Sequence, residues 1–109
     1  MNQADIQLLI DYNYWANDRL WRVLPKVSPE QFTAPNTSSY GSLRGTLVHT
    51  LRAEMIWRRR LQGEKTPFGI PEEADFPTPQ SLLEAWQADE QSMRSFLAAV
   101  SEEFLHSTL

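Results

Sequence analysis

Three long segments of this chain repeat their apolar residues every three to four positions, and this periodicity limits the fold more than any other feature. The segments are residues 3–24, residues 43–62 and a stretch that begins at Thr78. No part of the sequence shows the strict alternation of apolar and polar residues that is typical of strands. The pattern therefore predicts one all-α domain over residues 1–109, an up-down helical bundle with three long helices.

Proline, glycine and hydroxyl residues mark where the predicted helices begin and end. Pro25 ends the first helix because proline cannot continue it. Ser42 is placed to cap the second helix, and Gly63 stands where a C′ glycine is expected. Thr78 then caps the third helix, with Pro79 at its first position.

The connections between these helices also have recognisable sequences. Ser28 and Gln31 have the spacing of a capping box, which predicts one short helical turn. Residues 33–42 are polar and predict a loop. Residues 63–79 form a long proline-rich connection, which we expect Phe68, Ile70 and Phe76 to hold against the bundle.

Each long helix carries one apolar stripe, and these stripes are the predicted core. The predicted core residues are Ile6, Leu9, Ile10, Leu20 and Leu24 in the first helix, Leu43, Leu47, Leu51 and Leu61 in the second, and Leu82, Trp86, Met93, Phe96, Leu97, Val100 and Phe104 in the third.

Polar residues interrupt every stripe near its middle: Asn13 and Asn17, then Glu54 and Arg58, then Asp89. Burying such groups without partners costs roughly 1–3 kcal/mol each. One interpretation is a hydrogen-bonded polar layer or a bundle-margin position, in which Glu54 and Arg58 pair at i,i+4 spacing. The other is a polar pocket that forms or supports a site.

His49 lies about 160° from the leucine stripe of its helix, so it is not a core position. A single histidine in such a place is either a surface residue or the first ligand of a site. His106 offers no obvious help, because it lies close to Leu109 and has no second histidine at helical spacing.

Composition excludes several classes of function. With no cysteine, the chain has no disulfide, thiolate nucleophile or cysteine-ligated zinc site. Its net charge of −4 disfavours binding to nucleic acid. No apolar run is long enough to span a membrane, and the N-terminal residues do not resemble a signal peptide, so we expect a cytoplasmic protein.

Two stretches resemble a known family. The sequence "YNYWANDRL", residues 12–20, resembles the first-helix signature of the DinB-like (YfiT-like) proteins, and "GSLRGTLVHTLRAEMIWRRRLQG", residues 41–63, is similar to their second helix. The resemblance extends over essentially all 109 residues. It implies a four-helix bundle, often a homodimer, that holds a divalent metal through one histidine of the second helix and a His-x-x-x-His pair of the fourth.

Transferred to this chain, the resemblance implies that His49 is a metal ligand. The chain contains no His-x-x-x-His pair, so it supplies one of the three ligands. Either it is a fragment of a longer protein, or the site has been lost, or another chain completes it. We expect the fragment, because three helices of this kind leave an apolar groove, and we expect that groove to cause dimerisation or aggregation.

Trp15, Asn17, Glu54 and Trp57 also match signature positions, without a ligand role. Asn17 or Glu54 could at most line the pocket or orient the ligands.

The function that the resemblance implies is a thiol-dependent transferase or isomerase, which uses zinc, nickel, iron or manganese to activate a low-molecular-weight thiol. The alternative is a non-catalytic helical interaction domain of stress response, in which the polar layer only sets the register of the helices. A third possibility, a DNA-binding helical domain, is disfavoured by the negative charge.

Overall fold

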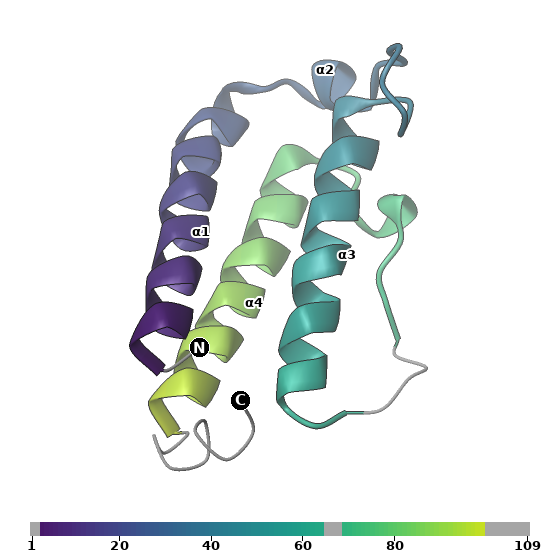
Figure 1. Ribbon diagram of the computed structural model, residues 1–109. Coiled ribbons are helices and arrows are strands. Elements are labelled where there is room, and N and C mark those ends of the chain that lie inside the picture. Colours follow the sequence, from purple (N-terminus) through teal and green to yellow (C-terminus); the bar gives the residue numbers. More distant parts are fainter. Residues whose placement is uncertain (1–2, 65–68, 100–109) are drawn as a thin grey trace.

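The computed structural model describes residues 3–64 and 69–99, and of Gln3, Ala4, Ile6 and Gln7 the backbone alone. These residues contain no strand and no helix long and apolar enough to cross a membrane. The elements are α1 (Gln3–Val23), the 3₁₀ turn η1 (Leu24–Lys26), α2 (Pro29–Thr33), α3 (Leu43–Leu61), the 3₁₀ turn η2 (Glu73–Asp75) and α4 (Pro79–Ala99). The predicted all-α bundle with three long helices is confirmed (Figure 1).

The helix boundaries follow the signals in the sequence. Ser28 accepts a hydrogen bond from the Gln31 backbone N–H at 3.1 Å, and the Gln31 side chain accepts one from the Ser28 N–H at 2.9 Å, so the capping box is complete. Ser42 caps α3 by accepting from the Gly45 N–H at 2.9 Å. Gly63 has a φ of +86°, the left-handed conformation that glycine supplies after a helix.

The long helices do not simply alternate in direction. α1 runs antiparallel to α3, whereas α4 runs in the same direction as α3 (Figure 1). Residues 69–78 run back along α3 to its first turn, so α4 begins at the same end of the bundle as α3 (Figure 1). Arg59 near the end of α3 donates to the Gly69 carbonyl at 2.6 Å, and Arg44 near its start pairs with Glu73 at 3.6 Å.

Two apolar clusters lie along the bundle with polar side chains between them. The upper cluster lies near α2, and the lower cluster, which is much smaller, lies toward the first turns of α1. The buried residues of the upper cluster are Trp21, Leu24, Phe32, Leu47, Val48, Leu51, Phe76, Leu82, Leu83 and Trp86. Those of the lower cluster are Tyr14, Met93 and Leu97.

The predicted core is correct for most of α4 and wrong at two leucines. Leu9 is 57% exposed and Leu61 is 37% exposed. Leu9 faces away because α1 packs through the line of Tyr14 and Trp21, which contacts α4. Leu61 belongs to the last turn of α3, beyond the residues of α3 that join the upper cluster. The Ile6 side chain, Phe68, Val100 and Phe104 lie outside the described residues.

Candidate functional site

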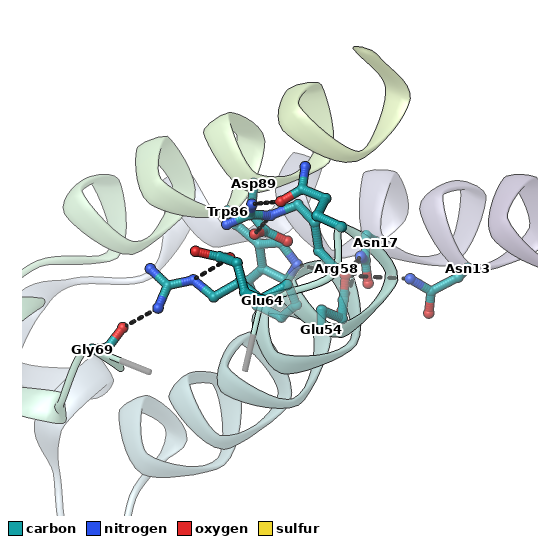
Figure 2. A network of polar contacts seen from close by, with 10 residues as sticks. Asn13, Asn17, Glu54, Arg58, Glu64, Gly69, Trp86 and Asp89 are labelled. Carbon is teal, nitrogen blue, oxygen red and sulfur yellow. Dashed lines mark hydrogen bonds and ion pairs between the residues drawn. The ribbon is translucent and has the colours of Figure 1, made fainter. Parts of the chain in front are cut away.

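The polar residues that interrupt the apolar stripes of the three long helices meet in one layer. This layer lies between the two apolar clusters, and Glu54 is at its centre (Figure 2). Asn17 of α1 donates its amide N–H groups to both Glu54 carboxylate oxygens, at 3.0 and 3.2 Å. The Trp86 indole N–H of α4 donates to Glu54 at 3.2 Å. Asn13, an exposed residue rather than a core one, reaches the same carboxylate at 3.3 Å. One carboxylate on α3 therefore joins all three long helices.

A buried ion pair continues the layer one turn further along α3. Arg58 Nε lies 2.6 Å from the Asp89 carboxylate, and the two side chains are only 14% and 4% exposed. Arg58 also donates to the Gln62 side-chain oxygen at 2.9 Å. The i,i+4 pair between Glu54 and Arg58, which one of the two interpretations contained, is not formed. Instead each side chain has its own partner on a neighbouring helix (Figure 2).

The electrostatics of the layer follow from burial. Desolvation raises the pKa of the Glu54 carboxyl above its ordinary value, against the opposing effect of the hydrogen bonds from Trp86, Asn17 and Asn13. Desolvation also raises the pKa of the Tyr14 hydroxyl, and the negative charges of Asp89 and Glu54 add to that effect. The donors around Glu54 are neutral amide and indole groups, so the geometry favours the interpretation as a structural polar layer.

His49 is not part of this layer. It is exposed on α3, about 140° around the helix axis from Glu54. Its imidazole ring stacks on the Tyr40 ring, with the ring centroids 4.2 Å apart and the planes inclined by 20°. Within the described residues His49 makes no hydrogen bond or ion pair, so neither of its ring nitrogens is bound to another of these residues.

Gly45 allows Tyr40 to reach His49. A Cβ atom at Gly45 would overlap the Tyr40 carbonyl oxygen, so only glycine permits the loop before α3 to lie this close to the helix. His49 is one helical turn after Gly45, and there the Tyr40 ring covers its imidazole. The role of Tyr40 was not predicted from the sequence, although Gly45, the second glycine of "GSLRG", was the available signal.

The described residues contain no complete metal site. In the parts of the chain described, no three or more histidine, cysteine, aspartate or glutamate side chains come together in a way that could hold an ion. Among these residues His49 is an exposed histidine, and imidazole is a side chain that first-row divalent metals commonly bind. His106 lies outside the described residues.

One comparison with known proteins gives a clear result. The model of a family described as the DinB family matches residues 1–109. No curated protein and no solved structure shows a significant match.

Proposed function

This chain belongs to the DinB family, and we propose that it binds a divalent metal through His49, with zinc, nickel, iron and manganese as the candidate ions. The observation that supports this proposal is the placement of His49. It is the only histidine among the described residues, it is exposed, and its ring is held by Tyr40 rather than by an internal hydrogen bond. A neutral imidazole held in this way suits first-row divalent metals.

The remaining ligands must come from outside the described residues or from another chain, because one imidazole binds such a metal weakly. Catalytic metals usually have three protein ligands and an open position. A metal held there would lower the pKa of a coordinated low-molecular-weight thiol, which is the chemistry of a thiol-dependent transferase or isomerase. In this proposal Tyr40 orients His49, and the polar layer fixes α3 relative to α1 and α4.

A non-catalytic interaction domain is the second candidate. The exposed aromatic side chains Trp15, at 56%, and Trp57, at 64%, favour it, since large apolar side chains at a surface commonly mark contacts with another protein. In that case His49 would be a surface residue without a ligand.

Metal titration of the protein as its gene encodes it separates the two candidates. Isothermal titration with ZnCl₂, NiCl₂, FeSO₄ under anaerobic conditions and MnCl₂ would be run on the unaltered protein, on His49→Ala and on His106→Ala. His106→Ala is the matched control, because each variant retains one of the two histidines. We expect at least one ion to bind the unaltered protein and His106→Ala, and binding to be lost in His49→Ala.

Loss of binding in both variants would also support His49 as a ligand and would add His106 to the site. Binding that His49→Ala leaves unchanged would overturn the proposal. So would the absence of binding by the unaltered, folded protein, and that result would favour the interaction domain.

A further inference from the structure

Two arginines of α3 differ from all the other arginines of the chain. The chain has eight arginines, and all of them are among the described residues. Arg52 and Arg60 are exposed and make no hydrogen bond, ion pair or ring contact with any described residue. The other six contact a carboxylate or an aromatic ring of the same chain: Arg19, Arg22, Arg44, Arg58, Arg59 and Arg94.

Arg52 and Arg60 lie on the same side of α3, together with two apolar side chains. At ~100° per residue, Arg52, Ile56 and Arg60 fall within a sector of about 80°, and Trp57 lies about 60° beyond Arg60. Arg60 is on the opposite side of the helix from Leu51, which is fully buried. Ile56 is half-buried, whereas Trp57 is 64% exposed. We call Arg52, Ile56, Trp57 and Arg60 the outer face of α3.

The positive charges of the outer face are not balanced by an acidic residue of the same helix. Glu54 is the one acidic residue of α3, and it lies about 120° or more around the axis from both arginines of the face. Residues 69–78 run along the neighbouring side of α3, where Glu73 pairs with Arg44 instead (Figure 1). The outer face therefore carries two positive charges on a chain whose net charge is −4.

Spacing and composition indicate the chemistry of a partner for this face. Arg52 and Arg60 are about 12 Å apart along the helix axis, because each residue rises ~1.5 Å. A partner helix that lies along α3 presents two carboxylates at this separation when they are seven or eight positions apart. Apolar side chains between those carboxylates then lie against Ile56 and Trp57. Arginine and tryptophan are enriched in protein–protein interfaces, and a guanidinium group binds a carboxylate through paired hydrogen bonds.

Two other occupants fit this face less well. A second copy of the chain would bring the two arginines against the same two arginines, since both ends of the face are positive. Duplex nucleic acid offers phosphates, but the net charge of −4 opposes its approach, and contacts from two cations release few counterions. A locally acidic segment of another protein avoids both difficulties.

We propose that the outer face of α3 binds an acidic, amphipathic helix of another protein. Its carboxylates pair with Arg52 and Arg60, and its apolar side chains cover Ile56 and Trp57. This inference gives the interaction domain, the second candidate function, a class of partner. It does not depend on metal binding by His49, because none of the four residues of the face is a proposed ligand.

A pair of synthetic peptides tests the proposal. One is a helical peptide with two glutamates seven positions apart and leucines between them, and the other has glutamines in place of the glutamates. Isothermal titration at low salt would compare the unaltered protein, Arg52→Gln/Arg60→Gln and Arg22→Gln/Lys26→Gln. The last variant is the matched control, because it removes the same charge from exposed residues of α1 and η1. Circular dichroism would verify that each variant keeps its helices.

We expect the glutamate peptide to bind the unaltered protein and the control variant equally. We expect it to bind Arg52→Gln/Arg60→Gln roughly tenfold more weakly, and the glutamine peptide to bind the unaltered protein more weakly by a similar factor. Equal binding of the two peptides would overturn the proposal, and so would equal binding by the unaltered protein and Arg52→Gln/Arg60→Gln. Absence of binding by the folded, unaltered protein would also overturn it.

Two further measurements examine the other occupants. Sedimentation equilibrium would compare the oligomeric mass of the unaltered protein with that of Arg52→Gln/Arg60→Gln, and a fluorescently labelled DNA duplex would be titrated with both. We expect equal masses, and weaker binding of the duplex than of the glutamate peptide. A lower mass for the variant would assign the face to a second copy and overturn the proposal. Tighter binding of the duplex, lost in the variant, would assign it to nucleic acid and overturn it as well.

Discussion

The Glu54 layer and the His49 position both carry polar residues on α3, but their surroundings differ. Glu54 receives hydrogen bonds from side chains of α1 and α4, and its polar contacts are satisfied within the bundle. His49 is exposed, and its ring stacks on the ring of Tyr40 from the preceding loop. Glu54, inside the apolar stripe, therefore holds three helices together, whereas His49, outside the stripe, is exposed at the surface.

The largest difference in the free energy of unfolding is expected between substitutions of two tryptophans, Trp86 in the layer and Trp57 at the surface. Trp86→Ala removes a 1% exposed side chain that fills the upper cluster and donates to Glu54. We expect the free energy of unfolding to fall by about 3–5 kcal/mol. Trp57→Ala, at a 64% exposed position, should change it by about 0.5 kcal/mol or less. Urea denaturation would measure both, and equal effects would contradict the assignment of Trp86 to the layer.

Two ion pairs provide the next comparison. Asp89→Ala leaves the Arg58 guanidinium without its buried partner, and we expect a loss of about 3 kcal/mol, the lower end of the range for broken buried pairs because Arg58 keeps Gln62. Asp18→Ala breaks the exposed pair with Arg22 and should cost about 1 kcal/mol or less. Thermal unfolding at two salt concentrations would measure both losses of stability. Only the loss caused by breaking the exposed pair should depend strongly on salt.

Gly45→Ala tests the loop that positions His49. The new methyl group must displace the Tyr40 backbone, and we expect a loss of about 1–3 kcal/mol together with separation of the two rings. Gly69→Ala is the control, since nothing lies close to a Cβ atom there. Chemical denaturation and the NMR signals of the His49 ring protons would report the two effects. Unchanged ring signals in Gly45→Ala would show that Tyr40 does not depend on Gly45.

The pH dependence of stability should distinguish Glu54 from surface carboxylates. Because burial raises the folded-state pKa of Glu54 above its ordinary value of 4.5, the folded state binds more protons than the unfolded state between the two values. The contribution of Glu54 to stability therefore falls as the pH rises through that window. Glu54→Gln removes this contribution, so its stability relative to the unaltered protein should increase from acid to neutral pH.

Denaturation at a series of pH values would measure this trend. Burial also raises the pKa of Glu90, so Glu90→Gln would show how much of the slope comes from that second carboxyl. A constant stability difference between Glu54→Gln and the unaltered protein would contradict a raised pKa.

The sequence predicted the elements well because their signals are local. Ser28, Ser42 and Gly63 act within one turn of their own helix, so their roles could be read directly. The partners of Glu54 and Arg58 were not predictable, since they depend on which helices come together and in which direction. The exposure of Leu9 was missed for the same reason, because α1 carries more than one apolar face.

The candidate site was predictable only in part. The position of His49 outside the leucine stripe is a local property, and the structure confirms that it is exposed. Its stacking on Tyr40 depends on a loop conformation that polar composition alone does not define. The role of His49 as a metal ligand stays a prediction.

Metal content and stability, measured together in His49→Ala and Glu54→Ala, test the distinction between the two positions most directly. Elemental analysis after gel filtration would give the metal content, and urea denaturation the stability. We expect His49→Ala to lose its metal with its metal-free stability almost unchanged, and Glu54→Ala to keep its metal but lose about 1–3 kcal/mol as the Asn17 and Trp86 donors lose their acceptor. A His49→Ala protein that retains its metal, or unfolds as easily as Glu54→Ala, would contradict the account.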